Sequence, residues 1–222
     1  MDDIDLGVVY RESRARVVAI VRDLPNAAQI NVPACPEWSV HGVVSHLVAV
    51  VEDVLAGRLT GPPTDEQTAA QVARRRDRST AAVVDEWEAL APPFEEFLSR
   101  TPVWPAALDV LSHEQDIRGA VDQPGARDVP GIRQGAELLI GSLRPPVDLL
   151  VRTEDGEHAV GPAGEAAGVE RLELTTTSFE AFRFRLGRRS RAQLASLAWS
   201  GDPGAVLNQL TIFGPSPLDV VE

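Results

Sequence analysis

The sequence predicts a mainly α-helical protein, with helices over residues 1–145 and a small α+β unit over residues 146–222. Three observations support this prediction. Apolar residues recur at helical spacing through most of the first part of the chain. Strand-like alternation of apolar and polar residues begins near residue 149, just after the turn signal at residues 145–146. With 222 residues, of which 44% are hydrophobic, the chain is long enough to bury a substantial core.

Two amphipathic helices are predicted at the start of the chain. The first covers residues 4–24, where apolar residues recur at helical spacing until Pro25 follows. A proline-punctuated loop over residues 31–36 leads to the second helix, residues 40–56, for which Ser39 is a suitable N-cap. The apolar residues of each helix fall on one face, so both helices are expected to pack against a core.

Four more helices are predicted before the pattern changes, at residues 65–77, 80–99, 105–121 and 130–143. Thr64 and Gln67 form the capping-box pattern at the start of the first of these. Pro92 and Pro93 are expected to kink or break the second, because proline removes a helical hydrogen bond and clashes with the preceding turn.

The last part of the chain is expected to mix strands and short helices. The predicted strands are residues 149–153, 158–160 and 169–175. Asp155-Gly156 is a turn signal between the first two, which therefore form a hairpin. Ser178 and Ser190 are expected to cap two helices, which run to about residues 186 and 199, and a last short helix follows the turn at residues 201–203. A unit of about 75 residues should dock on the helical part rather than fold strongly alone.

Composition excludes several classes of function. The formal net charge of −12 should repel nucleic acid and anionic lipid, and the basic run at residues 74–78 is expected to be a solvated helix face. No apolar run reaches the ~18 residues that a membrane span needs, and the acidic start lacks the basic region of a secretory signal. We therefore expect a cytoplasmic protein without nucleic-acid or membrane partners. The single cysteine, Cys35, excludes an internal disulfide, and a small buried hydrophobe is favoured there over a catalytic thiol.

A group of titratable side chains in the helix at residues 105–121 suggests a metal site. Asp109 and His113 are four residues apart, so they lie on one face of that helix. His46, in the middle of the second predicted helix, can complete a three-ligand site with them. Asp116 lies on the same side as this pair, where it either orients a ligand histidine or is simply solvated.

Two imidazoles and a carboxylate suit a divalent first-row metal such as zinc, which in catalytic sites takes three protein ligands and keeps an open position. Water or a thiol at that position becomes a nucleophile near neutral pH, because the metal lowers its pKa. Ordinary interpretations stay open: an ion pair between Asp109 and His113 on a helix surface, and a hydrogen-bonded core histidine for His46. The sequence contains no glycine-rich phosphate loop, no Cys-x-x-Cys and no Gly-x-Ser-x-Gly motif.

Several segments resemble the mycothiol-dependent maleylpyruvate isomerase family, whose members are DinB-like metal-binding helix bundles. Residues 32–40 (Val-Pro-Ala-Cys-Pro-Glu-Trp-Ser-Val), followed by Ser-His-Leu at residues 45–47, resemble the N-terminal signature of the family. The segment at residues 109–116 is similar to the family's Glu-x-x-x-His-x-x-Asp pattern. Residues 187–193 and 199–203 resemble the C-terminal domain of many members, so the likeness covers nearly the whole chain.

The resemblance implies a DinB-like four-helix bundle over residues 1–145 with the small α+β domain appended over residues 146–222. It implies that His46, Asp109 and His113 hold the metal, with zinc favoured and nickel as the alternative. Asp109 stands where the family usually has Glu, so its reach is shorter by about one carbon–carbon bond, ~1.5 Å.

The implied function is a metal-dependent, mycothiol-using isomerase or thiol S-transferase acting on a small electrophilic substrate, with the metal holding the thiol as thiolate. A member of a fold need not keep its activity. The alternatives are a non-catalytic protein that binds a small ligand or a partner, and a metal-dependent hydrolase. Arg118, Arg188 and Arg189 are candidates for holding an anionic substrate, with ordinary surface or capping roles as the alternative. The absence of Lys among the 21 basic residues fits an actinobacterial source, and a monomer or homodimer is expected.

Overall fold

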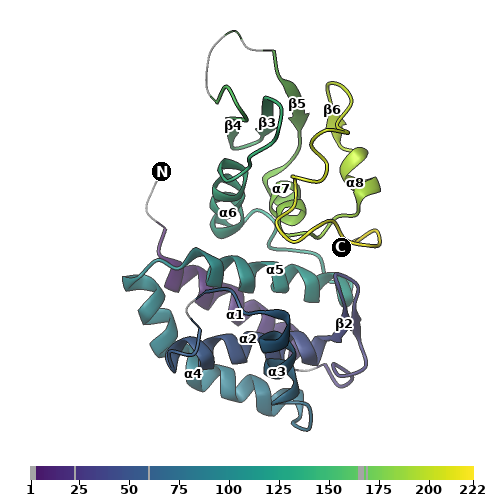
Figure 1. The fold of residues 1–222 in the computed structure, drawn as a ribbon. Helices are drawn as coiled ribbons and strands as arrows, with labels where there is room; N and C mark the ends of the chain where they lie inside the picture. The colour runs from purple at the N-terminus through teal and green to yellow at the C-terminus, as the bar shows by residue number, and fades with distance from the viewer. Residues whose placement is uncertain (1–3, 23, 60, 165–167, 169) are drawn as a thin grey trace. The chain divides into compact units, whose positions relative to one another are not determined.

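The computed structural model describes residues 4–22, 24–59, 61–164, 168 and 170–222, and Figure 1 shows its elements. It divides into two compact units, Met1–Gly125 with Glu222, and Ala126–Val221. This division falls earlier in the chain than the boundary near residue 145 that the sequence suggested. The reason is that α6 (Pro130–Gly141) packs against α7 (Ser178–Arg185) and therefore belongs to the second unit.

The described residues of the first unit form a helix bundle with a short hairpin. Its helices are α1 (Leu6–Val21), α2 (Val40–Leu55), α3 (Asp65–Ala73), α4 (Thr80–Arg100) and α5 (Trp104–Ala120). The four long helices form the bundle, since α1 packs against α4 and α5, and α2 packs against the same two helices (Figure 1). The predicted mainly α fold, with a four-helix bundle followed by a small α+β part, is confirmed.

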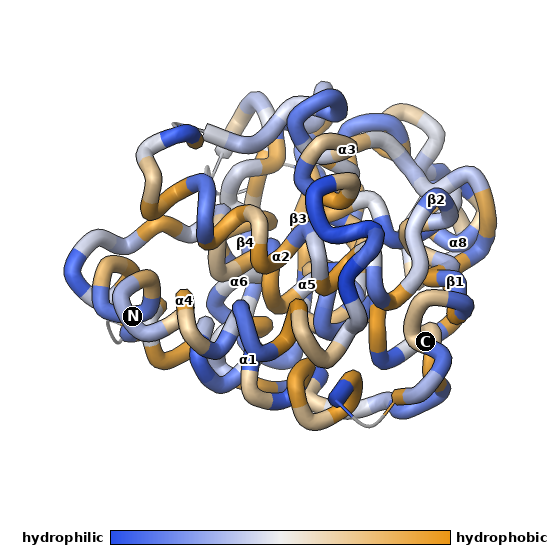
Figure 2. The backbone as a smooth tube through the Cα atoms, turned by 90° about the horizontal axis from the view of Figure 1, so that it is seen from below, coloured by the Kyte–Doolittle hydropathy of each residue, from blue (hydrophilic) through white to orange (hydrophobic). Residues whose placement is uncertain are grey.

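The core of the bundle is built on large side chains from α1 and α4. Tyr10 packs edge-to-face on Phe94, with ring centroids 4.9 Å apart, and on Trp87, with centroids 6.4 Å apart. The indole Nε1 of Trp87 donates a 3.0 Å hydrogen bond to the Tyr10 hydroxyl, so this buried polar pair is satisfied. Hydrophobic and hydrophilic stretches alternate along the helices, as the period of an amphipathic helix requires (Figure 2).

Helix α4 continues through Pro92 and Pro93, so of the two expected outcomes, a kink or a break, the break does not occur. Both prolines lie on the exposed face of the helix, where water can reach the carbonyls that lose their helical donors. On the opposite face, Trp87, Phe94 and Leu98 are fully buried and hold the helix on the core. The burial of this stripe outweighs the local cost of the prolines.

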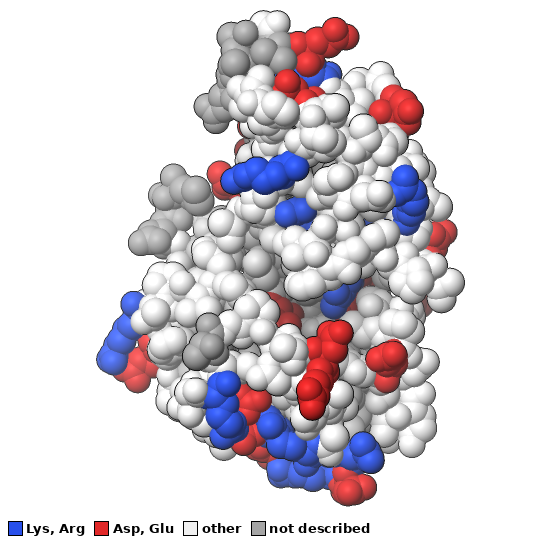
Figure 3. Space-filling view, in the orientation of Figure 1, with Lys and Arg blue, Asp and Glu red and all other residues white. Residues whose placement is uncertain are grey.

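Two other segments of the first unit differ from expectation. Residues 31–36, expected to be a loop, contribute to a short antiparallel hairpin of β1 (Asn31–Val32) and β2 (Cys35–Ser39). The basic run at residues 74–78 follows the end of α3 as a turn rather than a helix face. Within it Arg75 is buried and forms ion pairs with Glu52, at 2.8 Å, and with Glu86. Basic side chains gather beside acidic ones at the lower edge of the view in Figure 3.

Besides α6 and α7, the second unit contains β3 (Leu149–Thr153), β4 (Gly156–Val160), β5 (Leu172–Thr175), α8 (Arg191–Ala195) and β6 (Ala198–Trp199). The four strands form one sheet in the order β4-β3-β5-β6, and α6 packs against α7 and β4. Strands β3 and β4 form the antiparallel hairpin that the sequence predicted, while β5 runs parallel to β3 and antiparallel to β6.

Three expectations for the second unit are corrected. Thr177, not Ser178, caps α7, and its hydroxyl accepts a hydrogen bond from the Glu180 amide. Helix α8 is capped by Ser190 as predicted, but it ends at residue 195 and gives way to β6. The residues after Pro203 form turns instead of a last helix. Among the described residues, no helix combines the length and apolar character needed to cross a membrane.

Candidate metal centre

The structure brings together the three side chains that the sequence singled out. His46 comes from α2, while Asp109 and His113 come from successive turns of α5, which packs against α2. Asp109 Oδ1 lies 3.5 Å from His46 Nε2 and 3.5 Å from His113 Nε2. One ligand atom from each residue lies within 4.8 Å of the other two. Both imidazoles are buried, and the side chain of Asp109 is 29% exposed.

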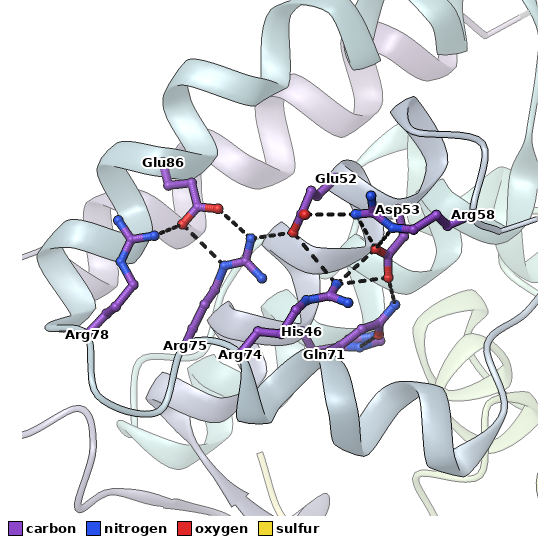
Figure 4. A network of polar contacts seen from close by, with 9 residues as sticks. All are labelled: His46, Glu52, Asp53, Arg58, Gln71, Arg74, Arg75, Arg78 and Glu86. Carbon is purple, nitrogen blue, oxygen red and sulfur yellow. Dashed lines mark hydrogen bonds and ion pairs between the residues drawn. The ribbon is translucent and has the colours of Figure 1, made fainter.

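The tautomer of His46 follows from its hydrogen-bond partners on the side away from Asp109. Its Nδ1 lies 2.9 Å from Gln71 Oε1, and Gln71 Nε2 donates a 2.8 Å hydrogen bond to Asp53 Oδ2 (Figure 4). Because a carboxylate only accepts, Asp53 turns the nitrogen of the Gln71 amide toward itself and its oxygen toward His46. The Nδ1 of His46 therefore carries the proton, and a neutral imidazole presents a lone pair at Nε2.

His113 is held in the same way by a direct carboxylate contact. Its Nδ1 lies 2.9 Å from Oδ2 of Asp116, a buried residue of the same helix. This contact places the proton on Nδ1 and the lone pair on Nε2. The Cys35 thiol donates to the same Asp116 oxygen at 3.5 Å. Asp116 is therefore placed to orient the ring of His113 and is not solvated.

Three electron-pair donors consequently face one point, and no proton of a neutral imidazole lies between them. The ordinary interpretation as an ion pair requires an imidazolium, because each Nδ1 already holds the single proton of a neutral ring. A tetrahedral zinc ion with bonds of about 2.0–2.1 Å has ligand atoms roughly 3.3 Å apart. The observed 3.5 Å from Asp109 Oδ1 to each Nε2 is close to this separation. The donor set and its spacing thus fit a divalent cation, even with the shorter Asp109 side chain.

Trp38, which the sequence did not single out as a site residue, packs beside both imidazoles. Its ring centroid lies 5.1 Å from that of His46 and 6.0 Å from that of His113, with the planes tilted by 37° and 38°. Gly42 permits this approach, since an added Cβ would lie 3.3 Å from the Trp38 Cβ. The indole therefore covers one side of both imidazole rings. The signal available in the sequence was its place in the segment at residues 32–40.

The arginine candidates have structural partners. Arg118 Nε donates to Glu114 Oε1 at 3.0 Å and its Nη1 donates to the Gln123 carbonyl at 3.1 Å. Glu114 is fully buried, and it also accepts from Ser13 Oγ at 2.7 Å. Arg118 therefore stabilises the bundle near the C-terminal end of α5.

The two C-terminal candidates belong to the second unit. Arg188 Nη1 donates to the Leu186 carbonyl at 2.8 Å, and Arg189 forms a bidentate ion pair with Glu180. These contacts tie α7 to the segment that follows it. Arg189 is buried, so its ion pair with Glu180 satisfies a charge inside the second unit.

A second titratable group shares one member with the first. Cys35, His113 and Asp116 also lie with one ligand atom each within 4.8 Å of one another. Cys35 is half-buried instead of forming a small buried hydrophobe, and its thiol faces the carboxylate that holds His113. Cys35 and Asp116 therefore lie near the Nδ1 edge of the His113 ring, whereas Asp109 lies at its Nε2 edge.

Comparison with known proteins identifies the family of the chain. Residues 10–121 match the family model described as the mycothiol maleylpyruvate isomerase N-terminal domain. The chain belongs to this family. All three candidate ligands of this family member lie within the matched residues. No curated protein matches the sequence significantly.

Two solved structures share the fold of this family member. One is the crystal structure of the mycothiol-dependent maleylpyruvate isomerase, at 13% sequence identity and a TM-score of 0.54, covering 88% of this chain and 91% of that chain. The other is a histidine-to-alanine variant of that enzyme, at 13% identity and a TM-score of 0.53, with the same coverage of both chains. At this identity the likeness establishes the fold alone.

Proposed function

We propose that this family member is a metal-dependent isomerase or thiol S-transferase that uses mycothiol and acts on a small electrophilic substrate. The observation that carries the proposal is the convergence of His46 Nε2, His113 Nε2 and Asp109 Oδ1 with both Nδ1 atoms already engaged. Membership in the mycothiol maleylpyruvate isomerase family supports the choice of thiol and of reaction class.

Each residue of the centre has a separate task in this proposal. His46, Asp109 and His113 would hold the cation, and two imidazoles with one carboxylate suit zinc, with nickel as the alternative. A divalent cation there supplies the Lewis acidity that keeps a thiol ionised near neutral pH. Asp116 holds the Nδ1 proton of His113 and so keeps its Nε2 lone pair directed into the centre. Trp38 excludes water from one side of the two rings.

Metal content and thiol consumption test the proposal together. Purified full-length protein is expected to retain one zinc or nickel ion per chain, while His46→Ala and His113→Ala lose it. His158→Ala, which removes a histidine of β4 in the second unit, is the matched control and should retain the metal. The wild-type protein should then consume mycothiol in the presence of small electrophiles.

The possible outcomes separate the alternative functions. Retained metal without mycothiol consumption favours a binding protein, and retained metal with hydrolysis of esters or amides favours a metal-dependent hydrolase. Absence of bound metal from every preparation, with unchanged thermal stability in both histidine variants, contradicts the enzymatic proposal altogether.

A further inference from the structure

Helix α3 is held on the bundle in an unusual way. It has nine residues, Asp65–Ala73, all of them described, and Gln71 is the buried residue among them, at 0% exposure. A helix this short is marginal on its own, so its position must depend on contacts with the rest of the unit. The side chain that it buries most deeply is a polar amide, and the contacts of that amide therefore matter for docking.

The Gln71 amide bridges two residues of α2. It accepts from His46 Nδ1 at 2.9 Å and donates to Asp53 Oδ2 at 2.8 Å (Figure 4). His46 and Asp53 are seven residues apart, which is about two helical turns, so they present their side chains on the same face of α2. One glutamine of α3 thus joins a candidate metal ligand to a buried carboxylate.

Asp53 is itself fixed by two cations: Arg58, which follows α2, and Arg74, the C-cap residue of α3. Arg58 Nε donates to Oδ1 at 2.8 Å, and Arg74 Nη2 lies 2.9 Å from Oδ1 and 3.0 Å from Oδ2. Burial acts to raise the pKa of Asp53, but hydrogen bonds from Gln71, Arg74 and Arg58 lower it by more, so the pKa falls below its ordinary value. An ionised Asp53 accepts only, and it therefore fixes the orientation of the Gln71 amide.

We propose that Gln71 is a positioning residue for His46 and that it couples the docking of α3 on α2 to occupation of the metal centre. The inference rests on the metal centre of the proposed function. Gln71 keeps the proton of His46 on Nδ1, so that Nε2 offers its lone pair. A cation bound at Nε2 makes Nδ1–H a stronger donor to Gln71 and so strengthens the attachment of α3. By thermodynamic linkage, the factor by which the bound cation strengthens the docking of α3 equals the factor by which undocking of α3 weakens the affinity for the cation.

The first test is metal affinity, measured with Zn²⁺ in competition with a chelator on the full-length protein. Gln71→Leu, close in size to the native residue, should bind zinc about 10- to 100-fold more weakly. Gln29→Leu is the matched control, since Gln29 is exposed, and it should bind as tightly as wild type. Adding Asp53→Asn to Gln71→Leu should weaken zinc binding little further, because Asp53 acts on His46 through the Gln71 amide.

The second test is the tautomer of His46 in zinc-free protein, read from imidazole ¹⁵N shifts. Wild type should show the proton on Nδ1. In Asp53→Asn the new amide can donate to Gln71, which frees Gln71 to turn its nitrogen toward His46 and moves the proton to Nε2. This isosteric change gives a readout that general loosening of the fold would not produce.

The third test is amide hydrogen exchange. Zinc should slow exchange across residues 65–73 in wild type and leave it unchanged in Gln71→Leu. If wild type binds zinc while Gln71→Leu binds equally tightly and α3 does not respond to zinc, the coupling is contradicted and the proposed function stands. If wild type binds no zinc, both fall together.

Discussion

Replacing Asp109 by Asn should leave stability unchanged or slightly raised without metal, and should lower it with metal. Asp109 Oδ1 lies 3.5 Å from the Nε2 atoms of both His46 and His113, and each Nε2 carries a lone pair in the neutral ring. Without metal, these three acceptors repel one another, and the amide nitrogen of Asn replaces that repulsion with a hydrogen-bond donor. With metal, the same change removes the only anionic ligand of the three.

The magnitudes follow from the two states. A new hydrogen bond to one imidazole contributes about 0.5–1.5 kcal/mol, toward the lower end here because residue 109 is 29% exposed. In wild type, zinc at a thousand times its Kd stabilises the folded state by about 4 kcal/mol. For a chain of this length that corresponds to a rise in Tm of roughly 8–16 °C. Asp109→Asn should lose most of this rise.

Thermal unfolding at pH 8, where free imidazoles are neutral, provides the assay. Asp109→Asn should unfold at the same temperature as wild type or slightly higher in a chelator, and well below wild type in excess zinc. Asp77→Asn removes an exposed acid of the same unit and should follow wild type in both conditions. Equal destabilisation of Asp109→Asn in both conditions would show that the three residues form a hydrogen-bonded structural cluster.

Three further outcomes are expected from urea unfolding. Glu114→Gln should lower the free energy of unfolding by about 2–4 kcal/mol, because it leaves the partly buried Arg16, whose Nε lies 2.7 Å from Glu114 Oε1, without its carboxylate; no measurable change would refute this role. Tyr10→Phe should cost about 1–3 kcal/mol by leaving the buried Nε1–H of Trp87 without an acceptor. If the lost acceptor is the reason, the double variant Tyr10→Phe/Trp87→Phe should lose less free energy of unfolding than the two single variants lose in sum. The pKa of Asp53 lies below its ordinary 3.8, because the hydrogen bonds that it accepts outweigh the effect of burial. The ionised carboxylate therefore contributes to the free energy of unfolding above pH 3.8, and this contribution is lost as pH falls through the pKa of the folded state. Asp53→Asn should therefore be less stable than wild type at pH 7, and the difference should shrink in acid; a constant difference would contradict this.

The helices could be predicted from sequence because their signals are local. The capping box of Thr64 and Gln67 and the N-cap Ser39 are present as predicted, since a cap needs only residues within one turn. The continuity of α4 could not be predicted, because proline rules describe the backbone while the exposure of Pro92 and Pro93 depends on packing. The placement of α6 in the second unit also depends on its partner α7, which residue pattern does not reveal.

In the candidate site, too, what local sequence signals determine could be predicted, and what tertiary packing determines could not. Helical period alone places Asp109 and His113 on one face. His46 could be proposed as the third member from its place in the middle of an apolar helix, and the family resemblance supported that choice, because residue spacing does not show whether two distant helices meet. Gln71 and Trp38 were not predicted, since a short polar helix and a proline-rich segment usually indicate surface. Their positions beside His46 are set by tertiary packing, which brings α3 and β2 onto α2.

X-ray absorption at the metal edge of zinc-loaded wild-type protein measures most directly whether three side chains of α2 and α5 hold one cation. The expected spectrum has two imidazole nitrogens and a carboxylate oxygen at about 2.0–2.1 Å from zinc. His113→Ala should lose one imidazole contribution or the metal altogether. Zinc surrounded only by water or oxygen ligands, with no imidazole scattering, would contradict a centre built from His46, Asp109 and His113.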